Sequence, residues 1–326
     1  MDCPGCGSSN PVSYTFCSRC GATLTQMMNV RDDRLKEARE YIMRVIAGRK
    51  MTDRIVSWLW ILVPVLILLI LGVIAIALFA YSALSMFSGG MSASDGAVIN
   101  LFAEILIMSA GVVATAVFAY LAYVLVRRQN DHFSRDRALR EGIIRLLRTA
   151  SDPSGRSSLV MNELAAMSGA SAPKEDYHDE RIWGLLMTMP LIMVALIFLV
   201  ILYSAIGPLP MVAIIVLPVT VILAIGQFLA TYYMFYFLGK QMREHDDRWL
   251  VFEQNARAII SKLRWPPIVR MKYKRLEDRD FAIYLLLSIF IPFFVLYWWY
   301  TLIKDPNDHF ESQWEFEDRL AEIIRK

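Results

Sequence analysis

The chain has few residues of the kinds that carry out chemistry. Its 326 residues include four cysteines, all among the first twenty residues, and four histidines. It contains no His-Glu-x-x-His motif, no glycine-rich phosphate-binding loop and no Gly-x-Ser-x-Gly motif. Paired aspartates inside the hydrophobic segments, which an intramembrane aspartyl protease needs, are also absent. A membrane enzyme is therefore the least favoured functional class.

Long apolar segments dominate the remainder of the chain. Apolar residues make up 56% of the sequence, and the mean hydropathy is +0.42. Five apolar segments each exceed the roughly 20 residues that a membrane-spanning helix needs. They are residues 55–81, 97–126, 182–205, 209–238 and 281–303. This pattern predicts an all-α polytopic membrane protein with four full transmembrane helices and a fifth hydrophobic segment.

The fifth segment, 281–303, has two interpretations. It is either one transmembrane span or a re-entrant hairpin that turns at Ile291-Pro292. Each leg of such a hairpin is about 17 Å long, too short to cross a bilayer. The choice decides on which side of the membrane the carboxyl terminus lies, and four cationic residues after the segment favour the hairpin.

Positive charge is missing from two connections, which indicates the orientation. Residues 82–96 and 206–208 contain no Lys or Arg. All 34 cationic residues lie elsewhere: Arg19, eight in 31–54, ten in 127–181, eleven in 239–280 and four in 304–326. The positive-inside rule places these basic segments in the cytoplasm. We expect a multi-pass protein of the cell membrane with a cytoplasmic amino terminus and, in the hairpin arrangement, a cytoplasmic carboxyl terminus.

The amino terminus holds two Cys-x-x-Cys pairs, Cys3/Cys6 and Cys17/Cys20, each followed by a glycine, Gly7 or Gly21. Four thiolates fill the tetrahedral shell of one structural Zn²⁺ ion, and the alternative is two disulfides. A reducing cytosol favours zinc.

These residues resemble a short zinc-ribbon module over positions 3–21. The resemblance implies a small β-type module, here residues 1–24, that binds a protein partner or nucleic acid or caps the chain. Few ionisable side chains besides the cysteines lie in it, which argues against nucleic-acid binding by this module.

The tetrapeptide Asn-Asp-His-Phe occurs twice, and its histidines reveal an internal repeat. The motif Tyr-x2-Tyr-x-Leu-x-[Lys/Arg]-x3-[Asp/Glu]-His ends at His132, His245 and His309. An acid-arginine pair precedes the apolar part of each repeat: Asp53-Arg54, Glu180-Arg181 and Asp278-Arg279. We expect each histidine to mark the start of a cytosolic amphipathic helix.

The repeat gives the following domain organisation. An amphipathic helix at 29–50 precedes repeat 1, residues 53–149, with its cytosolic helix at 132–149. A linker at 150–178 leads to repeat 2, residues 179–264, with a helix at 246–264. Repeat 3 covers 278–326, with a helix at 309–326. Residues 279–311 also resemble an uncharacterised family of prokaryotic membrane domains, which implies a fold but no chemistry.

Several residues are candidates for function beyond the cysteines. His132, His245 and His309 could converge on one metal ion, but a role at helix starts is the favoured interpretation. Glu104 is the one formally charged residue well inside a predicted span and could couple transport to protons or cations. Six cationic residues in 264–279 could bind anionic lipid headgroups, or could reflect only the positive-inside bias.

Besides the membrane enzyme, which is least favoured, two functional classes remain. The favoured one is a non-enzymatic integral membrane protein whose zinc ribbon and amphipathic helices form a platform for a cytosolic partner or for oligomer contacts. The alternative is a small transporter or channel built from repeated helix hairpins. The sequence identifies neither a ligand nor a partner.

Overall fold

The computed structural model describes residues 3, 5–11, 14–151, 158–171, 174–204, 210–269, 275–291 and 293–325. Within these residues it contains helices and no strand, and one isolated bridge joins Phe16 to Thr23. Four helices are long and apolar enough to cross a membrane. The prediction of an all-α chain with four potential transmembrane helices is confirmed, whereas the described part of the predicted β-type module has no strand.

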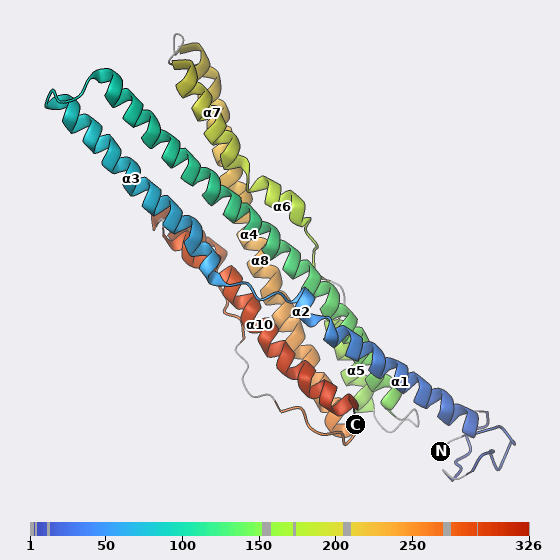
Figure 1. The fold of residues 1–326 in the computed structure, drawn as a ribbon. Coiled ribbons are helices and arrows are strands. Elements are labelled where there is room, and N and C mark those ends of the chain that lie inside the picture. The colour runs from blue at the N-terminus through green and yellow to red at the C-terminus, as the bar shows by residue number, and fades with distance from the viewer. Residues whose placement is uncertain are drawn as a thin grey trace.

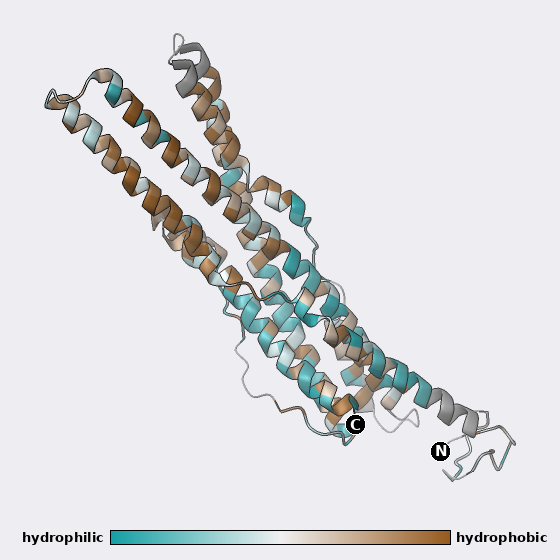
Figure 2. Cartoon of the chain, in the orientation of Figure 1, coloured by the Kyte–Doolittle hydropathy of each residue, from teal (hydrophilic) through white to brown (hydrophobic). Residues whose placement is uncertain are grey.

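The molecule consists of two apolar helix pairs that extend from a polar bundle (Figure 1). In one pair, α3 (Leu62–Phe87) packs along the first half of α4 (Ala93–Ala150). In the other, α7 (Met189–Ser204) packs along the first half of α8 (Pro210–Lys262). Figure 2 shows the hydropathy changing sharply along α4 and α8, from apolar in the pairs to polar in the bundle.

The polar bundle is built around the second halves of α4 and α8. Against them pack α1 (Thr25–Ala47), α5 (Ser158–Ala170) and α10 (Phe294–Arg325). Shorter elements lead from the bundle into the apolar pairs. These are α2 (Arg49–Thr52), the 3-10 helix η1 (Trp58–Ile61) and α6 (Glu180–Leu186).

The sequence predicts that a helix begins at His132 and another at His245. In the structure no helix begins at either residue. α4 runs unbroken for 58 residues and α8 for 53 residues, so both histidines lie within continuous helices. No proline follows Pro218 in α8, and α4 contains none, so nothing interrupts the backbone hydrogen bonds as the helices leave the apolar region. The predicted helices at 132–149 and 246–264 are the second halves of these long helices.

The fifth hydrophobic segment, residues 281–303, forms a hairpin rather than a single span. Its first leg is α9 (Phe281–Phe290), and α10 begins at Phe294. Pro292 of the expected turn lies outside the described residues. Ten residues of helix extend only about 15 Å, half of a bilayer core. α10 then continues into the polar bundle, where Arg49 of α2 forms an ion pair with Asp318 at 2.8 Å.

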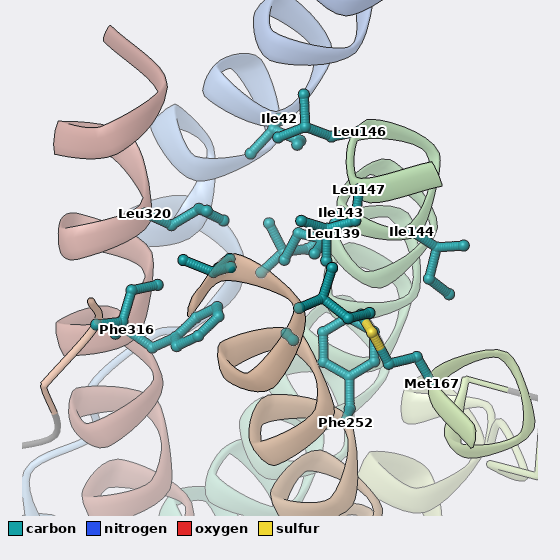
Figure 3. Close-up of a cluster of buried hydrophobic side chains, with 14 of the residues drawn as sticks. Ile42, Leu139, Ile143, Ile144, Leu146, Leu147, Met167, Phe252, Phe316 and Leu320 are labelled. Carbon is teal, nitrogen blue, oxygen red and sulfur yellow. The ribbon is translucent and has the colours of Figure 1, made fainter. Parts of the chain in front are cut away.

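A hydrophobic core holds the polar bundle together (Figure 3). Leu139 and Ile143 of α4 face Phe252 and Ile259 of α8, and all four side chains are fully buried. Ile42 of α1, Met167 of α5 and Leu320 of α10 complete the same cluster. Burial of such side chains contributes about 1.5–3 kcal/mol each, so this core is a major source of stability outside the apolar pairs.

The predicted linker at 150–178 contains ordered structure. Residues 152–157 and 172–173 lie outside the described residues, but α5 occupies 158–170 between them. Val160, Leu164 and Met167 of α5 are buried in the bundle core. The segment predicted as a linker therefore contains a helix, because its apolar residues at helical spacing cover the core.

Close packing of α1 against α4 leads to a first prediction. A Cβ atom at Gly142 would lie 2.9 Å from Cδ1 of Tyr41 and 3.0 Å from Cγ1 of Ile42. We expect Gly142→Ala to destabilise the protein by about 1–3 kcal/mol, because the two helices must separate. Thermal unfolding in detergent measures this loss. Gly111→Ala on the same helix is the control, because a Cβ atom there would meet no atom of the described residues within 4 Å. Equal effects of both changes would contradict the packing argument.

Candidate metal centre

The four cysteines come together at the amino terminus as the sequence predicts. Their sulfur atoms all lie within 4.8 Å of one another, and none forms a disulfide. Gly7 and Gly21 adopt φ angles of +70° and +73°, which confirms the two glycine-closed turns. The backbone N–H of each glycine donates to the carbonyl of the first cysteine of its pair, Cys3 or Cys17.

The sulfur geometry suits a tetrahedral metal ion. The Sγ atoms of Cys3 and Cys20 are 3.4 Å apart, and those of Cys6 and Cys17 are 3.6 Å apart. Zn–S bonds of ~2.3 Å place tetrahedral sulfur ligands about 3.8 Å apart. A hydrogen bond from the Ser8 hydroxyl lowers the pKa of Cys17 to about 5, which favours the thiolate form that binds metal. The cysteine cluster can therefore bind one metal ion.

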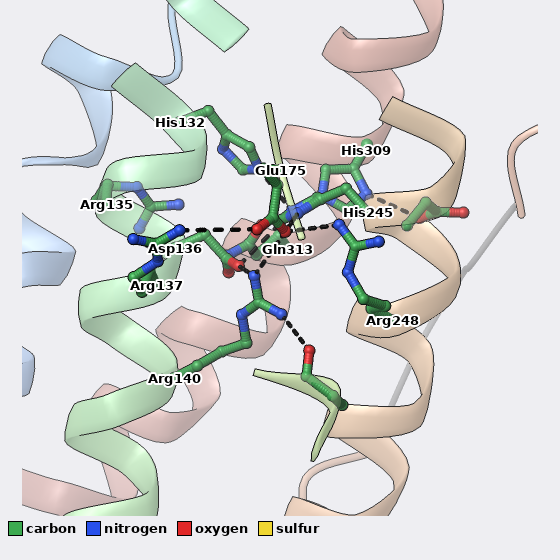
Figure 4. A network of polar contacts seen from close by, with 12 residues as sticks. His132, Arg135, Asp136, Arg137, Arg140, Glu175, His245, Arg248, His309 and Gln313 are labelled. Carbon is green, nitrogen blue, oxygen red and sulfur yellow. Dashed lines mark hydrogen bonds and ion pairs between the residues drawn. The ribbon is translucent and has the colours of Figure 1, made fainter. Parts of the chain in front are cut away.

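A second cluster forms deep in the polar bundle from three histidines (Figure 4). His132 comes from α4, His245 from α8 and His309 from α10, and each is at most 2% exposed. One ring nitrogen of each lies within 4.8 Å of the other two. The Nε2 atoms of His132 and His245 are 3.2 Å apart. The helix-start role that the sequence favoured is wrong, because all three side chains point into one buried site.

A carboxylate holds the opposite nitrogen of each ring. Nδ1 of His132 lies 3.1 Å from Asp53, Nδ1 of His245 lies 3.2 Å from Glu175, and Nδ1 of His309 lies 2.8 Å from Asp246. A carboxylate on Nδ1 favours the tautomer that carries its proton there and leaves Nε2 with a free lone pair. Metal-binding histidines almost always have such a partner. All three rings are therefore oriented as metal ligands.

The short distance between the Nε2 atoms of His132 and His245 requires a proton or a metal ion between them. Burial lowers the pKa of His132 and lowers that of His245 to about 3, so both rings are neutral at physiological pH. Neutral Nε2 atoms that face each other repel unless a proton or a metal ion lies between them. Zn–N bonds of ~2.0–2.1 Å place tetrahedral ligand nitrogens about 3.3 Å apart, close to the observed 3.2 Å. Nε2 of His309 is also buried and has no hydrogen-bond partner in the described structure.

Buried and partly buried arginines contact the carboxylates around the histidines. Arg135 forms ion pairs with Asp53 at 2.6 Å and with Glu317 at 2.7 Å. Arg248 binds Glu175 at 2.6 Å. Arg140 binds Asp136 at 2.6 Å and the carbonyl of Ala170 at 2.8 Å. These contacts hold Asp53, Glu175 and Asp136 in place beside the histidines.

The residue two positions before each histidine contacts a segment that leads into a different apolar part of the chain. Asn130 donates to the carbonyl of His178, ahead of α6, at 2.6 Å. Arg243 forms an ion pair with Asp278, ahead of α9. Asn307 donates to the carbonyl of Val56, ahead of η1, at 2.8 Å. The three contacts follow a cyclic order, in which the last unit closes onto the first.

The other candidate residues are separate from the histidines. Glu104 is half-buried on α4 and lies 28 residues before His132, which is about 42 Å along a helix. In the basic stretch 264–279, residues 270–274 lie outside the described residues. Arg275 pairs with Asp247, and Arg279 pairs with Asp305, so acids of the same chain already neutralise these two cations.

The sequence indicated some parts of this site and concealed others. Asp53 was recognised at the entrance of a repeat, but not as a partner of His132. Glu175 lies in the stretch assigned to a linker, and nothing in its local sequence marks it. One local signal was available: Asp136 follows His132 by four residues, a spacing that places two side chains on the same face of a helix.

In the part of the chain that the structure describes, the fold and the two clusters define a helical protein with four potential transmembrane helices and two sites that could hold metal ions. Comparisons of the chain with known protein families, with curated proteins and with solved structures find no match.

Proposed function

We propose that the protein is an integral membrane metalloprotein that serves as an assembly platform. A divalent transition-metal ion, with Zn²⁺ as the best fit, binds His132, His245 and His309 and joins α4, α8 and α10. The observation that carries this proposal is the convergence of three buried imidazoles whose Nδ1 atoms are all held by carboxylates. That arrangement directs three nitrogen ligands at one point.

The position of the site supports a role in assembly of the fold. Each histidine belongs to a different copy of the repeat that the sequence indicates, and the cyclic contacts of Asn130, Arg243 and Asn307 also support that repeat. An ion at the centre links all three copies where the apolar pairs meet the polar bundle. Because a preformed site rarely exists in an unfolded chain, the binding free energy of the ion stabilises this arrangement.

The polar bundle faces the cytosol in this proposal. The cationic residues of the described bundle and the four free cysteines agree with that side of the membrane. The cysteine cluster binds a second Zn²⁺ ion as a zinc-ribbon module and offers a small folded surface to a cytosolic protein. Glu104 lies apart from both clusters, so a transporter mechanism that uses it gains no support from them.

Metal analysis of the purified full-length protein tests this proposal. We expect two ions per chain in the unaltered protein, and one after all four cysteines, Cys3, Cys6, Cys17 and Cys20, are changed to serine. A further His245→Ala change should remove the remaining ion, because only two nitrogen ligands are left. Elemental analysis after gel filtration in detergent gives these ratios.

The fourth histidine provides a matched control. His178 stacks on Phe237 with ring centroids 3.8 Å apart and does not belong to the cluster. His178→Ala in the same cysteine-free background should keep one ion. Retention of the ion after His245→Ala, or no ion in the cysteine-free protein that still folds, would show that the histidine site does not bind metal.

A further inference from the structure

The histidine site has three ligands, and a tetrahedral ion needs a fourth. In catalytic zinc sites the fourth position is open to water, whereas in structural sites a protein ligand closes it. The identity of the fourth ligand therefore decides what the ion can do. Among the described residues, the carboxylate of Asp136 approaches these nitrogens, and its Oδ2 lies 3.6 Å from Nε2 of His245. The cluster within 4.8 Å contains the three imidazoles and not Asp136, so Asp136 must move toward the other two rings to bind the same ion.

We propose that Asp136 is the fourth metal ligand, so that the ion has a closed shell of three imidazole nitrogens and one carboxylate oxygen. This inference rests on the proposed metal binding at the histidines. Asp136 follows His132 by four residues on α4, and this spacing directs both side chains to one ion from the same helical face. Its side chain is fully buried.

The surroundings of Asp136 resemble those of a ligand rather than of an isolated ion-pair partner. Its Oδ1 accepts a hydrogen bond from Nε2 of Gln313 at 2.8 Å, which fixes the orientation of the carboxylate. Its Oδ2 lies 2.6 Å from Arg140 but has no well-aligned hydrogen bond within the described structure. A carboxylate oxygen has two lone pairs, so Oδ2 can contact Arg140 and an ion together. Ligating carboxylates are usually held by such outer hydrogen bonds.

The three copies of the repeat differ four residues after the histidine, and only one copy has a carboxylate there. Four residues after the histidines stand Asp136, Trp249 and Gln313. One unit supplies the ligand, and another supplies the amide that orients it. A closed shell of three nitrogens and one oxygen leaves no place for a metal-bound water. The ion then holds the helices together and does not activate a nucleophile.

Replacement of the ion with Co²⁺ tests this proposal, because its visible absorption reports the ligands. The cysteine-free full-length protein is loaded with Co²⁺ and titrated with azide, which displaces a bound water. We expect a tetrahedral spectrum that azide does not change. A response to azide in this protein would overturn the proposal, and this measurement does not depend on any change at Asp136.

Variants at Asp136 give the second readout. Asp136→Ala should admit water and make the spectrum sensitive to azide. Asp136→Asn should shift the spectrum and weaken Co²⁺ binding by more than Asp53→Asn, for which the loss of an outer partner predicts about 10–100-fold. Glu141→Gln, at an exposed acid on the same helix, is the control and should change neither property.

The outcomes separate the two proposals. If Asp136→Asn binds Co²⁺ with unchanged spectrum and affinity while His245→Ala does not bind it, the histidine site stands and the fourth-ligand assignment fails. If neither the unaltered site nor the variants bind Co²⁺, the metal proposal itself fails.

Discussion

Replacement of Arg128 by alanine should destabilise the protein by about 3–5 kcal/mol, because it leaves several buried acceptors without a donor. The Arg128 guanidinium is 1% exposed and crosses from α4 to α10. It donates to the carbonyls of Leu302 and Ile303 at 2.9 and 3.1 Å and to Oδ1 of Asn307 at 2.8 Å.

The reason for this contact lies in Pro306, inside α10. Proline has no N–H, so the carbonyl of Leu302, four residues earlier, loses its helical hydrogen bond. Arg128 supplies the missing donor, and α10 continues through the proline. Thermal unfolding in detergent should therefore show a large fall in the melting temperature of Arg128→Ala, with loss of helical signal from α10.

The neighbouring arginine is a close control. Arg127 is 40% exposed and contacts Tyr123 and Asp131 on its own helix. Because solvent screens these contacts, Arg127→Ala should leave the melting temperature almost unchanged. A similar loss in both variants would show that the charge near the apolar boundary matters, rather than the hydrogen bonds to α10.

Replacement of Arg135 by methionine should have an effect of similar size, about 3–5 kcal/mol, because it removes the guanidinium that two buried carboxylates share. Arg135 donates to both oxygens of Asp53, at 3.1 and 2.6 Å, and to Glu317 at 2.7 Å. Asp53 also accepts from Nε1 of Trp314 and orients His132. The change should therefore weaken metal binding as well as stability.

Two further variants identify the cause. Asp53→Asn with Glu317→Gln, added to Arg135→Met, removes the two negative charges that have lost this guanidinium and should recover much of the stability without restoring the metal affinity. Arg137→Met is the control, since Arg137 is one-third exposed and lies 3.9 Å from the carboxylate of Glu175. Denaturant unfolding and Zn²⁺ competition titrations measure the two properties. Failure of the triple variant to recover stability would indicate lost packing rather than unpaired charge.

The histidines show how far prediction from the sequence could reach. The repeat singled out His132, His245 and His309 from four histidines, and these three converge, whereas His178 lies outside the cluster. The favoured helix-start role was wrong because each histidine was judged within its own segment. In that local view, an acid before a histidine suggests a capped helix. The continuous helices α4 and α8 instead carry the rings into the bundle.

Local chemistry in the sequence determined the apolar helices and the two cysteine turns. Twenty or more consecutive apolar residues dictate a helix of membrane length, and the spacing of Cys3, Cys6, Cys17 and Cys20 with two glycines dictates paired turns. The sequence left open whether the fifth hydrophobic segment, 281–303, is one span or a hairpin. The hairpin of α9 and α10 settled it and brought His309 to the side of His132.

Only the tertiary structure decided the second site. Its contacts join residues far apart in the chain, such as Asp53 with His132 and His309 with Asp246. No local pattern encodes such pairs, because they depend on how three long helices pack and on where a segment between α5 and α6 places Glu175. Packing also buries the carboxylates and arginines together. Burial changes ordinary surface charges into a shell of paired charges around three imidazoles, because unpaired charges are too costly to leave in the interior.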